Sequence, residues 1–335
     1  MATPHALAMI ADIGGTNARF ALTDLASPQP QPQLLQQQSL RNAEFASLQH
    51  AAEHYLAGVC VQPRHAAIAV ACPVGADEIR LTNRAWSFSR SELQRSLGLA
   101  SLDMINDFGA VAWAVPALGS DEVVTLHGAE DAPLRGPVSV LGPGTGLGVA
   151  LLVGGDTPGW QVVETEGGHV GFAPLGDEEQ AIARWMTAKF GRVSTERLLC
   201  GAGLSHIDAA LAAGDDLASA LDARTPLRDP AALVEAALDG HDLLARRTLA
   251  RFCAVLGSVA GDAALIHGAR TVMIAGGIVP RFIPFLRSSA FRERFLAKGR
   301  FAAYLESVTI RVVTHPNPGL LGAAMALRAM QHPQT

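Results

Sequence analysis

Cysteine is scarce in this chain, long basic runs are absent, and aromatic residues make up only 5% of the sequence. The four cysteines form neither a CxxC pair nor a Cys/His cluster, which argues against a zinc motif and against a disulfide framework. This usage is typical of a reducing compartment, so we expect a cytoplasmic protein. The cysteines are Cys60, Cys72, Cys200 and Cys253.

Positive charge is also in short supply. Lys and Arg total 26 against 31 Asp and Glu, which gives a net charge of -5. A protein that binds the phosphate backbone of a nucleic acid needs a basic surface. We therefore expect no nucleic-acid partner.

The sequence also lacks the marks of export and of membrane insertion. No Lys or Arg precedes Arg19, whereas a secretory signal needs a basic start. Residues 136–163 carry one charge, at Asp156, over a length that would span a bilayer. Pro143 and the alternating glycines of Gly142–Gly148 suit a turn between strands better than a helix. We expect neither an export signal nor a membrane partner.

Two glycine-rich turns separate pairs of short apolar runs, and each pattern predicts strand, tight turn, strand. Setting Thr145 on Thr16 aligns Gly144 with Gly15, a weak internal repeat that predicts two similar lobes. The first pair is Ala8–Ile13 and Arg19–Leu22 around Gly14–Asn17, and the second is Val138–Leu141 and Val149–Val153 around Gly142–Gly148.

Further apolar runs alternate between strand-like and helix-like periodicity, which predicts an α/β protein. The length of 335 residues exceeds one compact core and favours two lobes with a cleft between them. Pro28–Gln38 is rich in Pro and Gln and is predicted to be a loop. Predicted strands are Ala66–Ala71, Leu102–Ile105, Val272–Ala275 and Val308–Val313; predicted helices are Ser89–Leu97, Phe108–Val115, Glu178–Phe190, Ala209–Leu221, Pro230–Leu238, Asp242–Ile266 and Leu320–Met330.

The glycine turns can bind phosphate, because exposed backbone N–H groups reach phosphate oxygens where no side chain interferes. An ordinary hairpin turn is the alternative for either segment alone. Asp12, at the end of the first predicted strand, can hold Mg²⁺ or its water ligands, or it can simply cap the turn.

Taken together, these segments resemble the bacterial glucokinases of the hexokinase and actin-like ATPase superfamily. The resemblance runs from about Ala8 to about Ala326, and the motifs occur in the family order although each alone is weak. The phosphate motifs are Ala11-Asp12-Ile13-Gly14-Gly15-Thr16-Asn17 and Leu141–Gly148; the catalytic segment is Ile105-Asn106-Asp107; the sugar segments are Glu166-Gly167-Gly168-His169 and Ser194-Thr195-Glu196-Arg197; the adenosine segment is Ile274-Ala275-Gly276-Gly277-Ile278, and Asn317–Gly322 completes the set.

The resemblance implies a two-lobed actin-like ATPase fold of ribonuclease-H-like topology, with the active site in the cleft between the lobes. The smaller α/β lobe would contain residues 1–117 and 315–335, and the larger α/β lobe residues 118–314. Family likeness also implies a homodimer.

The implied activity is that of a glucokinase, which transfers the γ-phosphate of ATP to the 6-hydroxyl of glucose at the entry to glycolysis. Asp107 would be the general base, and glucose would be bound by Asn106, Asp107, Glu166, His169 and Glu196. Asp12 would hold Mg²⁺, directly or through water. ATP would be bound by Ala11, Asp12, Ile13, Gly14, Gly15, Thr16, Asn17, Gly144, Thr145, Gly146, Gly276 and Gly277.

The chemistry of these residue types agrees with the implied roles. A sugar hydroxyl is a poor nucleophile, and a carboxylate that accepts its proton provides general-base help. Asp107 lies at a predicted strand-to-helix junction, where an N-cap is the common alternative. Glu166 and Glu196 can each accept from two hydroxyls and His169 can donate or accept, which suits a polyol, whereas the alternative is a polar loop.

Three other functions share part of the pattern. The first is a kinase for another hexose or an amino sugar, which relative turnover on a panel of sugars would distinguish. The second is a non-catalytic sugar sensor, which would need a DNA-reading module for which the early position of Asp12 leaves no room. The third is an actin-like filament or chaperone ATPase, which has no need of the polyol set. The Cys-rich zinc segment of related repressor-type sugar kinases does not follow His169 here, which implies the zinc-free group.

Overall fold

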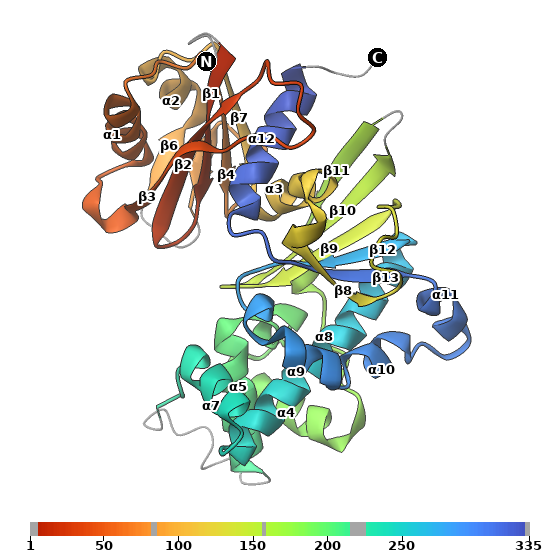
Figure 1. The fold of residues 1–335 in the computed structure, drawn as a ribbon. Coiled ribbons are helices and arrows are strands. Elements are labelled where there is room, and N and C mark those ends of the chain that lie inside the picture. Colours follow the sequence, from red (N-terminus) through yellow and green to blue (C-terminus); the bar gives the residue numbers. More distant parts are fainter. Residues whose placement is uncertain (1–5, 82–85, 156–158, 215–225, 332–335) are drawn as a thin grey trace. The chain divides into compact units, whose positions relative to one another are not determined.

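The computed structural model describes residues 6–81, 86–155, 159–214 and 226–331, and these form two compact units (Figure 1). The first unit contains the described residues up to 122, residues 154–164 and the described residues from 315 onward. The second contains residues 123–153 and the described part of 165–314. Each unit is built around its own sheet.

The sheet of the first unit has the strand order β3-β2-β1-β4-β7. β1 pairs antiparallel with β2 and parallel with β4, and β4 pairs parallel with β7. β1 and β4 are almost continuously buried, as expected for strands covered on both faces. The strands are β1 (Leu7–Ile13), β2 (Asn17–Asp24), β3 (Leu35–Arg41), β4 (His65–Val70) and β7 (Ser101–Asn106), and β5 (Glu78–Arg80) pairs separately with β6 (Ser87–Ser89).

The second sheet repeats this connectivity. Its order is β11-β10-β9-β12-β13-β8, in which β9 pairs antiparallel with β10 and parallel with β12, and β12 pairs parallel with β13. The predicted internal repeat is therefore confirmed at the level of topology. The strands are β8 (Val123–His127), β9 (Val138–Pro143), β10 (Leu147–Gly155), β11 (Gly159–Thr165), β12 (Thr271–Ile274) and β13 (Thr309–Val313).

Side-chain caps mark the start of several helices. Asp229 accepts from the N–H groups of the first turn of α7, where Pro230 fits because its missing N–H needs no partner. Gly240 ends α7 with a φ of +86°, which glycine adopts without strain. The helices are α1 (Leu48–Val59), α2 (Arg90–Ser96), α3 (Asp107–Ala114), α4 (Gly176–Phe190), α5 (Gly201–Ala213), α7 (Pro230–Asp239), α8 (Leu243–His267), α9 (Ile283–Ser288), α10 (Phe291–Leu296), α11 (Ala302–Glu306) and α12 (Pro318–Gln331).

Three local predictions need correction. The predicted loop Pro28–Gln38 includes the start of β3, an edge strand that pairs with β2. Its Gln side chains are exposed, so its sequence resembles that of a loop. The second turn is shorter than Gly142–Gly148, because Pro143 and Leu147 are already paired across the hairpin. The predicted helix Ala209–Leu221 corresponds to α5, which begins earlier and ends at Ala213, and residues 215–221 lie outside the described part.

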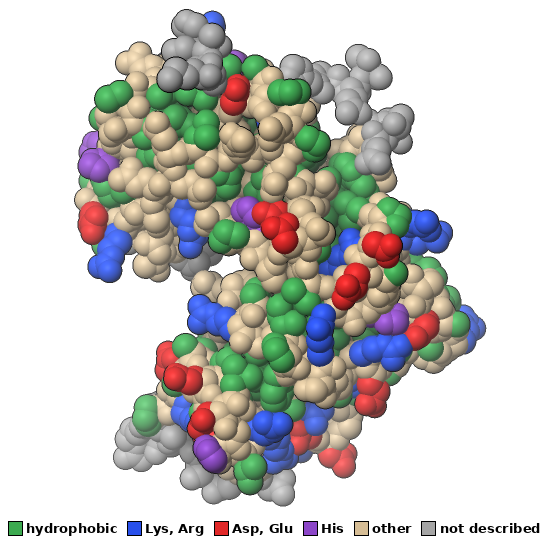
Figure 2. Space-filling view, in the orientation of Figure 1, with side chains coloured by type: hydrophobic (Ala, Val, Ile, Leu, Met, Phe, Trp, Pro, Cys, Tyr) green, Lys and Arg blue, Asp and Glu red, His purple; other side chains and the backbone are tan. Residues whose placement is uncertain are grey.

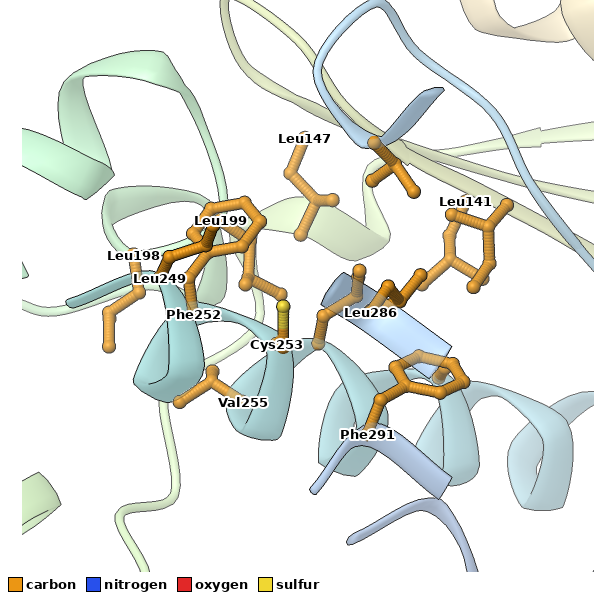
Figure 3. Close-up of a cluster of buried hydrophobic side chains, with 14 of the residues drawn as sticks. Leu141, Leu147, Leu198, Leu199, Leu249, Phe252, Cys253, Val255, Leu286 and Phe291 are labelled. Atoms are coloured by element: carbon orange, nitrogen blue, oxygen red, sulfur yellow. The ribbon is translucent and has the colours of Figure 1, made fainter. Parts of the chain in front are cut away.

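The core of the second unit surrounds α8, which lies beneath the sheet in Figure 1. In Figure 3, Phe252 and Cys253 of α8 lie close to Leu198 and Leu199, and all four side chains belong to one buried cluster. Among the described residues, α8 is long and apolar enough to cross a membrane, but it is 67% buried inside the protein. Such burial is characteristic of a core helix in a globular protein.

Helix α12 packs against the first sheet and against α3 (Figure 1). Its apolar face, which includes Leu320 and Leu327, is buried with Ile10 of β1 and Ala110 of α3. The two helices approach closely at Gly322, where an added Cβ would lie 1.6 Å from the Ala110 carbonyl oxygen. Glycine is therefore required at this crossing.

A buried ion-pair network joins three helices of the second unit. The carboxylate of Glu179 on α4 is fully buried and lies 2.7 Å from Arg294 Nη1 on α10 and 2.9 Å from Arg251 Nη1 on α8. The Leu175 N–H also donates to Glu179, at 2.8 Å. On the surface shown in Figure 2, by contrast, acidic and basic side chains are interspersed.

The Glu179 network predicts loss of stability in acid. Burial alone raises the pKa of Glu179, but hydrogen bonds from Arg294, the Leu175 N–H and Arg251 outweigh it and hold the pKa below its usual value. A lowered folded-state pKa stabilises the fold above the unfolded value of about 4.3, and this contribution is lost as the pH falls through the folded-state pKa.

We therefore expect the free energy of unfolding of the unmodified protein to fall below about pH 4.3, and Glu179→Gln to be destabilised at neutral pH. Urea unfolding of both proteins between about pH 7 and about pH 3 measures this. Glu293→Gln, which changes an exposed glutamate on α10, is the matched control. Equal stability of Glu179→Gln and the unmodified protein at neutral pH would show that the network contributes nothing.

Candidate active site

The first glycine turn joins β1 to β2 at one end of the first sheet. It is closed by the Gly14 N–H, which donates to the Asn17 carbonyl at 3.0 Å. Gly15 and Thr16 at its tip are exposed. Ala11 and Ile13, which precede the turn, are buried in the core, so only their backbone groups can face a ligand.

Asp12 is the next-to-last residue of β1, beside this turn, and its carboxylate is contacted from two sides. Arg19, its cross-strand partner on β2, places Nη1 3.3 Å from Asp12 Oδ2. Gly319 of α12 packs against the carboxylate, since an added Cβ would lie 2.9 Å from Asp12 Cγ. Burial raises the pKa of Asp12, and the charge and hydrogen bond of Arg19 act in the opposite direction.

The donor chemistry of Asp12 fits a magnesium ion carried by a nucleotide. Mg²⁺ is commonly bound by one or two carboxylates together with substrate phosphates. Asp12 provides one such carboxylate next to a turn with exposed N–H groups. The described residues contain no group of three or more His, Cys, Asp or Glu side chains that could hold a metal ion by themselves.

Asp107 is the first residue of α3, but the cap of this helix is its neighbour. Asn106 Oδ1 accepts from the N–H groups of Phe108 and Gly109, at 2.9 and 3.1 Å. The N-cap role that was the alternative for Asp107 is therefore filled mainly by Asn106. Burial raises the pKa of the Cys72 thiol, and the negative charge of Asp107 raises it further.

A second carboxylate approaches the start of α3. Glu164 Oε1 accepts from the Asn106 N–H at 2.9 Å. An added Cβ at Gly109 would lie 2.7 Å from the same oxygen, so glycine leaves the room that Glu164 fills. Sequence reasoning missed Glu164, although its position two residues before Glu166 was visible.

The second glycine turn joins β9 to β10 and consists of Gly144, Thr145 and Gly146. The Gly144 N–H donates to the Gly146 carbonyl at 2.8 Å, and the Gly144 carbonyl accepts from the N–H of Gly201 at 2.9 Å. Thr145 at the tip is exposed. Backbone contacts therefore fix the turn from both sides.

The predicted adenosine segment lies against the strand that leads into this turn. Gly276 has a φ of +85°, and an added Cβ would lie 2.2 Å from the Pro143 carbonyl oxygen. Gly142 is equally confined, with an added Cβ 2.6 Å from the Ala275 carbonyl. Gly277 is exposed, and nothing lies within 4 Å of an added Cβ there.

The predicted sugar residues of the second unit lie together and touch the second turn. Glu196 Oε2 accepts from the Leu147 N–H at 3.0 Å, and an added Cβ at Gly146 would lie 2.5 Å from the same oxygen. His169 lies between two carboxylates, with Nδ1 3.8 Å from Glu196 Oε1 and Nε2 3.9 Å from Glu166 Oε2. These three polar side chains form a cluster that begins at the glycine turn.

The hydrophobic core supports this cluster from below. Leu147 follows the turn, Leu198 and Leu199 follow Glu196, and all three side chains enter the buried cluster in Figure 3. Thr195 is also anchored, because its hydroxyl donates to the Gly168 carbonyl at 2.7 Å. The polar residues therefore project from backbone that packing holds in place.

The structure thus assembles the predicted residues as two sets, one in each unit. Asp12, the first turn, Asn106 and Asp107 belong to the first unit, and the second turn, Glu166, His169, Glu196 and the pair Gly276 and Gly277 belong to the second. Besides Glu164, sequence reasoning missed the contact of Gly319 with Asp12, although Gly319 lies within the matching segment Asn317–Gly322.

The chain is similar in sequence and in fold to known glucokinases. The family model described as Glucokinase matches residues 9–330. A glucokinase of Pectobacterium atrosepticum is 41% identical over 322 residues, which cover 96% of each chain. The crystal structure of a glucokinase from an Antarctic psychrotroph has a TM-score of 0.83 and 36% identity, covering 96% of this chain and 98% of that one.

A more distant structure shows the fold alone. The ROK hexokinase from Thermus thermophilus has a TM-score of 0.63 at 18% identity, covering 96% of this chain and 97% of that one. The expected actin-like ATPase fold is confirmed by these structural likenesses and by the repeated sheet topology. Because the family model spans nearly all of the described residues, the chain belongs to the Glucokinase family.

Proposed function

We propose that this protein is a glucokinase that transfers the γ-phosphate of ATP to the 6-hydroxyl of glucose. One observation carries the proposal: in the second unit, Glu196 contacts both the glycine turn and His169. A turn with exposed N–H groups suits a phosphate, and a cluster of carboxylate and imidazole groups suits ring hydroxyls. Their shared residue brings the two kinds of ligand next to each other.

Asp107 acts as the general base of the proposed reaction. Its carboxylate accepts the proton of the attacking 6-hydroxyl while the new bond to phosphorus forms and the bond to ADP breaks. Asn106 fixes the start of α3 and thereby orients Asp107. Glu166, His169 and Glu196 orient the sugar through its other hydroxyls.

The two glycine turns and Gly276-Gly277 bind ATP in this proposal, and Asp12 holds the accompanying Mg²⁺, directly or through water. The ion neutralises the charge that develops on the phosphates. We further propose that residues 1–117 with 315–335 form one lobe and residues 118–314 the other. We also propose that the protein is cytoplasmic and forms a homodimer.

The decisive experiment measures ADP release with ATP and Mg²⁺ in the presence of glucose, fructose, mannose or N-acetylglucosamine. The proposal expects the highest kcat/KM with glucose. A higher value with another sugar would assign the protein to the alternative hexose or amino-sugar kinases. No release with any sugar would favour the non-catalytic sensor.

His169→Ala should raise the KM for glucose by about tenfold and leave the KM for ATP within about twofold. The substitution removes the imidazole that lies between Glu166 and Glu196 without altering the glycine turns. Initial rates with either substrate varied measure both constants. The matched control is His241→Ala, which removes an exposed histidine of the same unit. An unchanged KM for glucose would exclude His169 from the sugar site.

A further inference from the structure

Asn42 holds the first glycine turn from its inner side. It is the first residue after edge strand β3 and is fully buried. Its Nδ2 donates to the Gly14 carbonyl at 2.8 Å, and its backbone N–H donates to the Thr16 carbonyl at 3.0 Å. Together with the bond from the Gly14 N–H to the Asn17 carbonyl, these contacts engage the carbonyls of Gly14, Thr16 and Asn17 within the protein.

The donors of the turn are left for a ligand. Gly15 and Thr16 are exposed, and within the described residues their backbone N–H groups donate to no protein acceptor. The turn therefore keeps the Gly14 and Thr16 carbonyls on the side of Asn42 and presents the Gly15 and Thr16 N–H groups at its tip. This separation matters for an anion, because an outward carbonyl would repel phosphate oxygens.

The unpaired Oδ1 atom of Asn42 supports the view that this side chain serves to hold the glycine turn. Its Oδ1 is buried and has no hydrogen-bond partner, an arrangement that costs stability. Rotating the amide by 180° would not help, because the oxygen would then face the Gly14 carbonyl oxygen. The Asn42 side chain therefore donates through Nδ2 to the Gly14 carbonyl, and its Oδ1 is left without a hydrogen bond.

We propose that Asn42 is a positioning residue for the phosphates of ATP, which it orders through the Gly14–Asn17 turn without touching them. The inference rests on the proposed function in one respect, that this turn contacts nucleotide phosphates. Two adjacent glycines allow the Gly14-Gly15 peptide to rotate with little steric cost. The Asn42 amide prevents that rotation by holding the Gly14 carbonyl inward.

The test compares ADP and adenosine, both with Mg²⁺, in calorimetric titrations of the unmodified protein, Asn42→Ala and Asn42→Leu. Leucine has the branching of asparagine and the same number of side-chain heavy atoms but cannot donate, so it removes the bond without leaving a cavity. We expect the Kd for ADP to rise about tenfold in both variants, and the Kd for adenosine to stay within about twofold. Gln38→Ala, which removes an exposed amide from β3, is the matched control.

A second measurement needs no variant. Titration of ¹⁵N-labelled unmodified protein with ADP should shift the amide resonances of Gly15 and Thr16, and titration with adenosine should not. Either an unchanged Kd for ADP in a folded variant, an equal loss for adenosine, or unmoved Gly15 and Thr16 amides would overturn the proposal. Glucose phosphorylation is assayed separately, so failure of the proposed function would be seen independently of the ADP and adenosine result.

Discussion

Asp107→Asn is expected to lower kcat by about 10²-fold or more while leaving the Kd for glucose nearly unchanged. The amide has the size of the carboxylate and can still hydrogen-bond to a hydroxyl, but it cannot accept the proton of the attacking group. The helix should remain intact, because Asn106 provides the N-cap. Steady-state rates and calorimetric titration with glucose measure the two effects.

Asp103→Asn provides the control for Asp107→Asn. Asp103 lies on β7, the strand that leads to Asp107, and its carboxylate is 4.0 Å from Arg90 Nη2. The same chemical change there should leave kcat within about twofold, since Asp103 is not assigned to the reaction. A full kcat in Asp107→Asn, or loss of glucose binding in a folded variant, would remove Asp107 from the role of base.

Gly322→Ala should destabilise the first unit by about 3 kcal/mol or more, although it adds only one methyl group. The new Cβ would lie 1.6 Å from the Ala110 carbonyl oxygen and 2.4 Å from its carbon, and backbone cannot rotate away as a side chain can. Helices α12 and α3 would have to separate, which would open the buried cluster that contains Ile10 and Leu327.

Gly58→Ala makes the same change where there is room. Gly58 is an exposed residue of α1 with nothing within 4 Å of an added Cβ. Alanine favours helix over glycine by about 1 kcal/mol, so this variant should be as stable as the unmodified protein or more stable. Urea unfolding compares the two variants. Equal stability of Gly322→Ala and the unmodified protein would mean that the two helices can adjust without cost.

Local patterns were sufficient to predict much of the fold. The first hairpin and strand β4 have apolar runs bounded by glycine or proline, and both occur within two residues of the predicted bounds. Strand β3 was missed because its exposed Gln residues resemble a loop, and only its pairing with β2 makes it a strand. Such pairing depends on contacts that a short window of sequence does not contain.

The residue types of the site were visible in the sequence, but their contacts were not. Glu196 and Leu147 are separated by 49 residues, and only the folded chain shows that the carboxylate binds the turn. Asn42 was missed for a related reason, since a single Asn after a polar strand is an ordinary start of a loop. Its role depends on a buried position under Gly14, which no local pattern indicates.

The place of α12 has a consequence for the order of events during synthesis. β1 leaves the ribosome first among the described strands, yet α12, which covers its Ala8 and Ile10 side, is made after all the other described helices and strands. Until residues 318–331 emerge, that apolar face is open to aggregation or to a chaperone, while the residues of the second unit have already been made. Released chains that end before Pro318 should therefore protect the second sheet from protease and leave the first one exposed.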